Sequence, residues 1–466
     1  MGFILLSEID KILSIPGKTI LIYGDIGSGK STFVRQLLMK HFNKALYIST
    51  VKPVEENLDI WFSDMKDETT NTSESILKRL RDRRGMFLAE SSRGTYLSRA
   101  KNVIRLRHKS IEEFISELYL HIRENEIEAF GIDSIDPIVR EEREKLYELI
   151  NISHKTHTIG IFATRSLNDP ILMTLFDGII HLKKSEYKGR LLRTLTFEKM
   201  AGIQLDQMRY IFTLYNKEVR VFQGKAWNYI YEHKIPKEYY NPKKGVYSTC
   251  SRTFDEYLSG GLKESNIYHF HLGLNIPNSF LVNLFYCVIS KWILQERKIQ
   301  IINSPMYSAK KLKQYFQRVI PSEIIDRNVQ FGSIDNSDNK NTIPIKRPAK
   351  LLTERWWSSR KDTEEPTLHF IVTDLLDNEL GYKDTKVFLL NLTRLIRDSR
   401  DFMIIITKEG SATNIEGIKL SEISSQINEV EGAYVLTKIK PADRKVFALD
   451  LVKKNGYYLP EVIPIV

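Results

Sequence analysis

Cysteine is nearly absent from this sequence, which contains only Cys250 and Cys287 among its 466 residues. Two thiols cannot build a disulfide framework, and they cannot supply the ligand set of a structural zinc site. We therefore interpret both as buried thiols of a protein in a reducing cytoplasm. Few cysteines beside abundant isoleucine, lysine and glutamate are also typical of proteins from thermophiles.

Long apolar runs are missing as well. No stretch approaches the roughly 20 residues of a membrane-spanning helix, and the first residues lack the pattern of a signal peptide. No nucleophile triad, thiol site or metal-binding cluster stands out. With 42% hydrophobic and 27% charged residues, the composition is that of a globular protein long enough for more than one core. We expect a cytoplasmic protein without a membrane partner.

The strongest positive signal lies near the N-terminus. Thr19–Tyr23 is a short apolar run of strand type, the next residues match G-x-x-x-x-G-K-[ST] at every fixed position, and apolar residues then recur at helical spacing. Glycines in such a loop let backbone N–H groups bind phosphate oxygens, and the dipole of the following helix adds to the attraction. The sequence therefore predicts a nucleotide-binding loop formed by Gly24, Asp25, Ile26, Gly27, Ser28, Gly29, Lys30, Ser31 and Thr32.

Three side chains have specific roles in the predicted site. Lys30 is expected to contact the β- and γ-phosphates of ATP, and the hydroxyl of Ser31 is expected to bind Mg²⁺. The apolar strand within residues 127–136 ends in Asp133, and a carboxylate at the end of a neighbouring strand can reach the metal through water. ATP and Mg²⁺ are therefore the predicted cofactors, with Ser31 and Asp133 as the metal-site residues.

The second half of the chain repeats the pattern of the first. Residues 239–245 have the composition of a linker, and a similar series of apolar strands and helices follows, including a strand that ends in Asp374 as the earlier one ends in Asp133. Strands that alternate with helices predict a mostly parallel sheet covered by helices on both faces. We predict an α/β protein with two copies of one domain, residues 1–238 and 239–466.

The counterpart of the phosphate loop in the second copy, residues 273–280, has lost its key chemistry. Ser279 and Phe280 stand at the lysine and hydroxyl positions, and Asn278 replaces the last glycine. Pro277 also removes a backbone donor. Because the phosphate clamp and the metal ligand are both missing, we expect the second copy not to bind Mg·ATP in the usual way.

These motifs resemble the KaiC-like branch of the RecA superfamily of P-loop ATPases, and the resemblance covers nearly the full length. Beside the phosphate loop, it is carried by Phe254–Leu262 (FDEYLSGGL), Ile132–Ser134 (IDS), Phe176–Ile180 (FDGII) and Glu198–Gly202 (EKMAG). The resemblance implies two tandem RecA-like P-loop domains, the second one degenerate, each a mostly parallel sheet flanked by helices. It also implies a homo-oligomer, such as a hexameric ring, and a protein partner.

Two departures from the family pattern bear on activity. The family's KMRG element usually reaches a nucleotide bound by the adjacent subunit; here Ala201 replaces its arginine, so only Lys199 is carried over as a nucleotide-binding residue. RecA-like ATPases also place a glutamate at the end of the second strand to orient the attacking water, whereas threonine and valine occupy positions 50–51. Glu55 and Glu56, one helical turn later, are the candidate catalytic substitutes. We expect tight nucleotide binding with slow turnover, a weak ATPase at most.

Much of the net charge of +11 lies in one segment. Residues 78–109 carry eleven Lys and Arg side chains against two acids, a net of +9. Such a segment attracts nucleic acid, an anionic partner or the acidic face of a neighbouring subunit, unless it is only a solvated surface. We expect it to form an excursion from the sheet, with Phe87 and Tyr96 as candidate base-stacking residues.

Three functions fit the sequence. The intact first site, the altered second copy and the missing glutamate favour a regulatory oligomer whose assembly and partner choice follow bound ATP. The basic segment favours a RecA-like DNA-binding ATPase in recombination or repair, although residues 165–174, where a DNA loop is expected, hold a single basic residue. A scaffold that keeps ATP as a structural ligand is the third. Salt-dependent DNA retention would identify the second function, and an ATP-dependent change of oligomer size would separate the first from the third.

Overall fold

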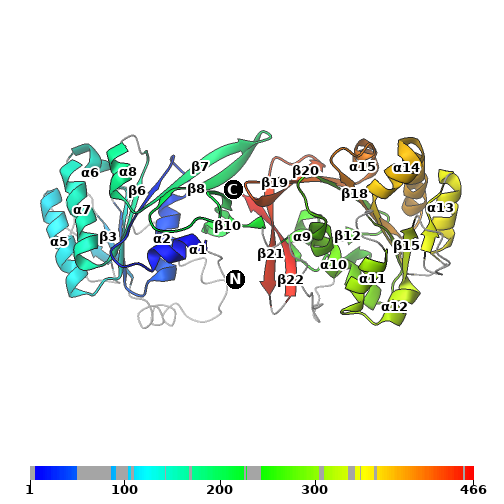
Figure 1. Cartoon of the computed structure of the whole chain (residues 1–466), viewed down its shortest axis with the longest axis horizontal. Coiled ribbons are helices and arrows are strands. Elements are labelled where there is room, and N and C mark those ends of the chain that lie inside the picture. The colour runs from blue at the N-terminus through cyan, green and yellow to red at the C-terminus, as the bar shows by residue number, and fades with distance from the viewer. Residues whose placement is uncertain are drawn as a thin grey trace. The chain divides into compact units, whose positions relative to one another are not determined.

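The computed structural model describes residues 6–49, 86–90, 103–105, 110–141, 143–166, 170–224, 227, 243–303, 309–333, 342–346, 348–360, 365–454 and 457–466. The chain folds into two compact units (Figure 1). Unit 1 consists of Met1–Tyr187, Leu191–Val221 and Val466, and unit 2 consists of Lys188–Arg190 and Phe222–Ile465. The predicted boundary between residues 238 and 239 falls outside the described residues and stays a prediction.

Unit 1 alternates strands with helices along the chain. Its helices are α1 (Ser7–Leu13), α2 (Lys30–His41), α5 (Ile111–Glu124), α6 (Asp136–Glu141), α7 (Arg143–Thr156) and α8 (Pro170–Leu175). Its strands are β1 (Thr19–Tyr23), β2 (Ala45–Ser49), β3 (Met86–Glu90), β4 (Val103–Arg105), β5 (Ala129–Asp133), β6 (Ile159–Thr164), β7 (Gly178–Tyr187), β8 (Arg190–Met200), β9 (Arg209–Thr213) and β10 (Arg220–Phe222).

The strands of unit 1 form one sheet in the order β10-β9-β8-β7-β1-β6-β5-β2-β3-β4. Strand β1 runs parallel to β6 and β7, and β5 runs parallel to β6 and β2, whereas β8 and β9 are antiparallel. Parallel strands end at the same edge of their sheet, which is where open α/β sheets bind ligands. This topology therefore brings the carboxyl ends of β1, β5 and β2 to one edge.

Both faces of this sheet are buried, as a parallel sheet requires. Alternate residues of β1 belong to different apolar clusters, because successive side chains of a strand point to opposite faces: Ile20 and Ile22 lie in one cluster and Leu21 in the other. Phe33 and Leu37 of α2 join the first cluster, and residues of α5 and α7 join the second. The apolar stripe of α2 thus fixes the helix that follows the phosphate loop onto the sheet.

Two stretches of the basic segment belong to the sheet. Strand β3 pairs in parallel with β2, and β4 pairs in parallel with β3. The prediction that residues 78–109 form an excursion from the sheet is therefore wrong for these two stretches. The reason is local composition, since the charge averaged over the segment hides the apolar runs MFLA and VI. The rest of the segment and all its side chains lie outside the described residues.

Unit 2 repeats the alternation. Its helices are α9 (Arg252–Tyr257), α10 (Asn278–Leu294), α11 (Ala309–Gln317), α12 (Ser322–Asn328), α13 (Ala349–Ser358), α14 (Thr373–Arg397) and α15 (Asn414–Leu420). The short strands β11 (Val246–Tyr247) and β12 (Leu262–Lys263) pair with each other. The main sheet contains β13 (Ile267–Leu272), β14 (Ile299–Ile302), β15 (Val329–Ser333), β16 (Thr342–Pro344), β17 (Leu368–Val372), β18 (Phe402–Lys408), β19 (Ile423–Val430), β20 (Ala433–Lys440), β21 (Val446–Lys454) and β22 (Tyr457–Ile465).

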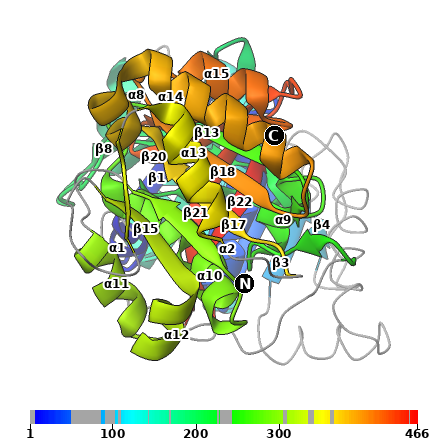
Figure 2. The same ribbon diagram turned by 90° about the vertical axis from the view of Figure 1, so that its right-hand side faces the viewer.

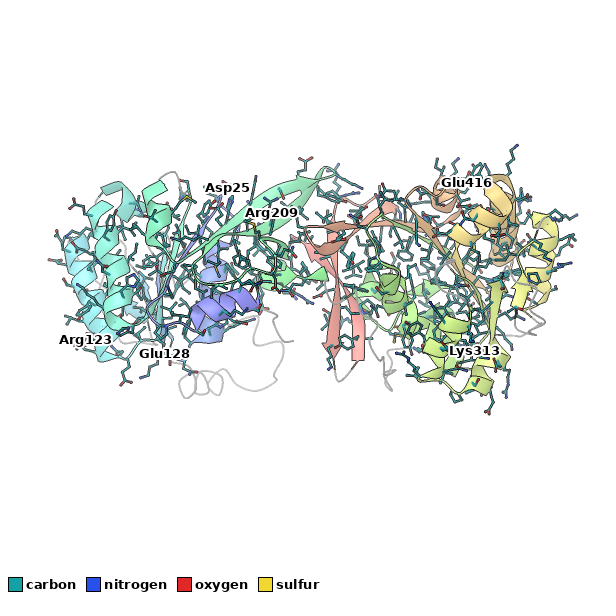
Figure 3. All side chains as sticks on the ribbon, viewed as in Figure 1. Asp25, Arg123, Glu128, Arg209, Lys313 and Glu416 are labelled. Carbon is teal, nitrogen blue, oxygen red and sulfur yellow. The ribbon has the colours of Figure 1, made fainter. Side chains whose placement is uncertain are left out.

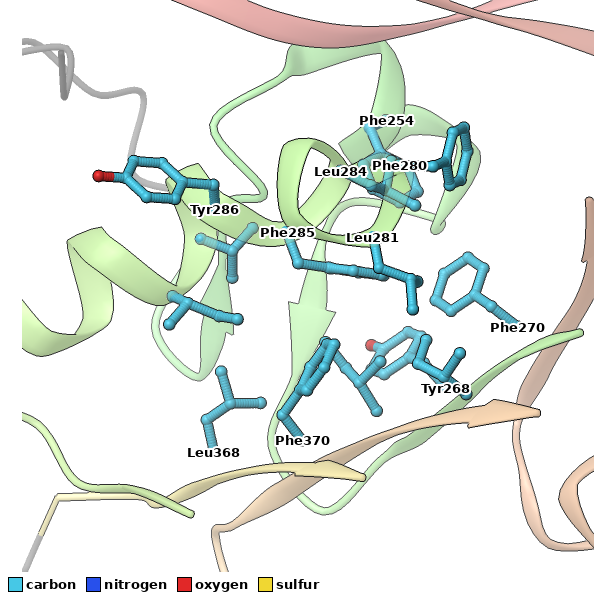
Figure 4. Packing of buried hydrophobic residues seen from close by; sticks show 14 of the residues in the cluster. Phe254, Tyr268, Phe270, Phe280, Leu281, Leu284, Phe285, Tyr286, Leu368 and Phe370 are labelled. Carbon is cyan, nitrogen blue, oxygen red and sulfur yellow. The ribbon is translucent and has the colours of Figure 1, made fainter. Parts of the chain in front are cut away.

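The main sheet of unit 2 has the order β16-β15-β14-β17-β18-β13-β19-β20-β21-β22, which is the order of unit 1 with β13 in the place of β1. Figure 2 shows α14 and α15 on one side of β17 and β18 and α10, α11 and α12 on the other. The face under α10 is rich in aromatic side chains, including Phe254, Phe270, Phe280 and Phe285 (Figure 4). The predicted α/β architecture of tandem RecA-like domains is confirmed.

One strand end of unit 2 differs from the prediction. Strand β17 ends at Val372, and Asp374 lies in the first turn of α14 rather than at the end of the strand.

Within the described residues, no helix combines the length and the apolar character needed to cross a membrane.

Candidate nucleotide-binding site

The predicted phosphate loop connects β1 to α2 in unit 1, and two of its glycines are required by close packing. Gly24 has a φ of 148°, and a Cβ there would lie 2.0 Å from the carbonyl oxygen of Leu182. Gly29 has a φ of 105°, and a Cβ there would lie 2.8 Å from Cδ2 of Leu214. No larger residue fits at either position without a shift of its neighbours. The loop includes Asp25, which is labelled in Figure 3.

The helix that follows offers an anion-binding terminus. Gly29 caps α2 without a side-chain hydrogen bond, so the first N–H groups of the helix are not satisfied by a capping side chain. Helix N-termini of this kind attract phosphate oxygens through their N–H groups and their dipole. Ser31 and Thr32 lie in this first turn and are partly exposed. The loop and the helix terminus together form the cradle that the motif predicted.

Lys30 folds back over its own loop. Its Nζ donates hydrogen bonds to the backbone oxygens of Gly24 and Asp25, the second over 2.9 Å. Burial lowers the pKa of Lys30, and the negative charges of Asp133, Asp136 and Asp25 oppose that shift. The ammonium group is therefore half-withdrawn from water and surrounded by carboxylates, which is where a phosphate with its metal ion would be accommodated.

Two cations from distant strands anchor the loop, and sequence reasoning missed both. Lys184 of β7 donates to the carbonyl oxygen of Ile26 over 2.7 Å, and Arg193 of β8 donates to that of Gly27 over 2.9 Å. Arg193 is 8% exposed, and this burial lowers the pKa of its guanidinium. The carbonyl groups of Ile26 and Gly27 are thus held by side chains, and the N–H of Ser28 donates to the carbonyl oxygen of Asp25 over 3.1 Å, so these contacts fix the shape of the loop.

Asp133 lies at the end of β5, and strand β6 lies between β5 and β1 in the sheet. It is 8% exposed and accepts a hydrogen bond of 2.7 Å from the hydroxyl of Tyr47. Burial, together with the Asp133 charge, raises the pKa of Tyr47 well above its usual value. The phenol therefore stays a donor to the carboxylate. Ser49, the last residue of β2, is the register partner of Asp133, so no acid stands there.

A third carboxylate, Asp136, was not predicted. Its Oδ1 accepts hydrogen bonds from the hydroxyl of Thr164 at 2.6 Å and from the backbone N–H of Arg165 at 3.1 Å. The hydroxyl of Ser134 donates to its other oxygen. These hydrogen bonds overcome the effect of burial and lower the pKa of Asp136. The sequence signal was present, since Asp136 follows Asp133 by three residues in IDSID.

Lys199 lies near the end of β8, and its contact with a nucleotide bound by a neighbouring subunit stays a prediction. Its Nζ donates to the carbonyl oxygens of Met173 and Thr174 at the end of α8, over 3.0 and 3.1 Å. The adjacent Glu198 accepts a hydrogen bond from the hydroxyl of Tyr23, whose ring stacks on that of His181 with centroids 4.3 Å apart. Glu198 and Lys199 thus connect β8 with β1, β7 and α8.

In the corresponding loop of unit 2, residues 273–280, Leu274 and Ser279 form hydrogen bonds with other residues of unit 2. The backbone N–H of Leu274 donates to the carboxylate of Glu409 over 3.1 Å. Asp374 forms an ion pair of 2.9 Å with Lys408, the last residue of β18. Ser279, at the lysine position, donates to the carbonyl oxygen of Trp227 over 3.0 Å.

Some predicted residues lie outside the described part of the chain. Glu55, Glu56 and positions 50–51 are among them, as are Tyr96 and most of residues 78–109. Among the described residues, no group of three or more His, Cys, Asp or Glu side chains could by itself hold a metal ion. A magnesium ion at this site would therefore depend on Ser31, Asp133 and the phosphate oxygens together.

Comparison with known proteins gives two findings. Residues 6–226 match the family model described as ATPase: KaiC. Over 334 residues the chain is 23% identical to Protein GvpD1 of Halobacterium salinarum, and the match covers 66% of this chain and 58% of that relative. The matched region thus spans little more than half the length of the relative.

Proposed function

We propose that this chain, whose residues 6–226 form a KaiC-type ATPase domain of the RecA superfamily, is an ATP-binding regulatory protein with slow turnover. Bound ATP would set its self-association and its choice of partner. The observation that carries the proposal is the contrast between the two loops. The loop of unit 1 presents a lysine and an uncapped helix terminus, whereas that of unit 2 faces its own glutamate.

The residues of unit 1 fit Mg·ATP. Gly24 and Gly29 let the loop pack closely against Leu182 and Leu214, and Lys30 would supply the cation that neutralises the phosphate charge. Ser31 and Asp133 provide the hydroxyl and carboxylate oxygens that Mg²⁺ prefers. The bound metal would polarise the terminal phosphate, while Lys184 and Arg193 keep the loop in shape.

Slow hydrolysis follows from the groups around the site. Ser49 ends β2 opposite Asp133, and a hydroxyl cannot take a proton from the attacking water at neutral pH. Asp136 is close to Lys30, but its oxygens already accept hydrogen bonds and its pKa is lowered, so it is a weak base. Glu55 and Glu56 remain the candidate substitutes.

Isothermal titration calorimetry of Mg·ATP with the full chain tests the proposal. We expect one nucleotide per chain for the wild type and for Ser279→Ala, since Ser279 only donates to a backbone carbonyl. Lys30→Ala should abolish measurable binding, because the phosphates lose their main cation. Binding of Mg·ATP that has the same stoichiometry and affinity in Lys30→Ala as in the wild type would contradict the proposal.

A further inference from the structure

Unit 2 contains a cavity that is unrelated to either phosphate loop. Its volume is about 330 Å³, and it lies beside the last turn of α10 and the amino ends of β17 and β18, whereas residues 273–280 follow the carboxyl end of β13. The charged or aromatic side chains that line it are Lys243, Lys244, Tyr247, Lys291, Trp292, Arg297, Glu365 and Arg400. The volume is at the lower end of that found for small-molecule sites.

The charge of this cavity is positive. Five Lys and Arg side chains line it against one acid, Glu365. Two further carboxylates lie close by: Glu264, which pairs with Arg400, and the buried Asp255, whose hydrogen bonds come from Ser248 and Thr249. Even with both of these included, five cations face three carboxylates. An anion that enters the cavity therefore meets an attractive field.

Aromatic packing holds one of the cations in a fixed position. The guanidinium of Arg297 lies 4.9 Å from the ring centroid of Tyr247 and 4.8 Å from that of Trp292. The other face of Tyr247 stacks on Phe402, with centroids 5.7 Å apart. Arg297 also pairs with Glu365 over 3.2 Å. Its donors are thus oriented before any ligand arrives, which reduces the entropy lost on binding.

Lys291 lines the cavity from α10. It projects from the last turn of α10 and is half-buried, and this burial lowers the pKa of its ammonium group. The charge of Asp255 opposes this shift. Lys243 and Lys244 are exposed at the rim and add two cations that can reach a bound anion.

We propose that this cavity binds a small molecule that carries two or more phosphate groups. Several lysines at fixed and flexible positions suit a di- or triphosphate, because each phosphate oxygen can accept a hydrogen bond from a different cation. Recognition would rest on the phosphates, since the guanidinium of Arg297 already lies over the rings of Tyr247 and Trp292. The proposal does not depend on the function proposed for unit 1.

A concave site of this kind favours a small ligand over nucleic acid. Duplex or single-stranded DNA needs a continuous cationic track along several phosphates. Here Glu264 and Glu365 lie against Arg400 and Arg297, and the two carboxylates interrupt such a track. A compact polyphosphate instead places its charge within the reach of Lys291, Lys243 and Lys244.

Calorimetric titration with inorganic tripolyphosphate, without magnesium, tests this site in the full chain. All proteins carry Lys30→Ala so that the loop of unit 1 does not contribute. We expect one binding site per chain, weakened about tenfold or more by Lys291→Gln through loss of a charged hydrogen bond. Lys310→Gln, an exposed lysine of α11 with the same charge change, is the control and should leave the affinity within about twofold.

Three results would overturn the proposal. They are the absence of binding in the parent protein, an equal loss for Lys291→Gln and Lys310→Gln, and displacement of tripolyphosphate by single-stranded DNA more effectively than by pyrophosphate. If Lys291→Gln unfolds unit 2, Lys244→Gln answers the same question, because its exposed side chain has little structural role. A weaker affinity for that variant supports the site, and an unchanged affinity for it contradicts the site.

Discussion

One residue position accounts for much of the difference between the two phosphate loops. The charges of Asp133, Asp136 and Asp25 act on Lys30, whose ammonium group donates to the backbone oxygens of Gly24 and Asp25. Its counterpart, Ser279, carries no charge, and Asp374 is instead neutralised by Lys408 from a neighbouring strand. In unit 2 the carboxylate of Asp374 therefore forms an ion pair with Lys408. In unit 1 the lysine of the loop itself, Lys30, lies near the carboxylates.

At the residue scale, the first prediction concerns ATP hydrolysis. We expect a turnover number well below the ~10 s⁻¹ that is typical of enzymes, because no glutamate stands at the end of β2. A coupled assay of phosphate release by the full chain measures this. Fast, saturable hydrolysis would contradict the prediction and show that another acid serves as base. Glu55→Gln and Glu56→Gln, tested separately, would then identify it.

A second prediction at this scale concerns acid stability. His269 is fully buried, and its ring nitrogens bond to the hydroxyls of Ser424 and Thr407, each over 2.8 Å. Burial lowers its pKa from 6.5 to about 3. Below pH 6.5 the unfolded chain therefore takes up a proton that the folded chain does not. The free energy of unfolding should fall as the pH drops, by about 3 kcal/mol down to about pH 4.5 from this group alone.

Guanidinium titrations followed by tryptophan fluorescence measure this loss in unit 2, which contains Trp292, Trp356 and Trp357. The variant His269→Gln should be less stable at neutral pH but should lose less stability on acidification. His154→Gln, at an exposed position of α7, should keep the wild-type slope. Equal slopes for all three proteins would show that His269 is not the group that resists protonation.

At the scale of elements, the parts of the site that could be predicted are those whose signal is contiguous in sequence. Strand β1, the loop and α2 follow one another, so a single motif identified Gly24–Thr32. Lys184 and Arg193 reach the same loop from 158 and 166 residues away, and nothing in their local sequence marks the contact. The same holds for Glu409, which meets Leu274 only because β13 and β18 pair in the sheet.

Helix α14 gives a prediction at this scale. It is interrupted at Gly381, whose φ of 75° and ψ of 165° belong to a region that only glycine occupies readily. Gly381→Ala should therefore lower the free energy of unfolding of unit 2 by about 1–3 kcal/mol. Urea denaturation checks this, with Asn378→Ala, exposed on the same helix, as a control expected within about 0.5 kcal/mol of wild type. A loss as small as that of the control would mean that the kink is not required.

At the scale of the whole molecule, the two units share one strand order but differ in the side chains of their loops, with Lys30 in unit 1 and Ser279 in unit 2. A duplicated fold with one altered site keeps the surfaces of the fold and loses one nucleotide. This is expected of a protein in which the second copy supports assembly or partner binding rather than chemistry. Under the proposed function, ATP bound to the loop of unit 1 controls assembly.

The last prediction is that Mg·ATP changes the oligomeric state. A ligand that binds the assembled form more tightly than the single chain shifts the equilibrium by mass action, and symmetric closed assemblies are the usual outcome. Size-exclusion chromatography with light scattering should show the 54.4 kDa chain moving to a higher mass with Mg·ATP and returning on removal of the metal. Lys30→Ala should not respond, whereas Lys310→Ala should respond as the wild type does. If the mass stays constant while calorimetry shows bound ATP, the nucleotide is only a structural ligand. A mass increase that requires DNA, weakens steeply with salt and depends on Arg81, Arg83 and Arg84 would instead support the DNA-binding alternative.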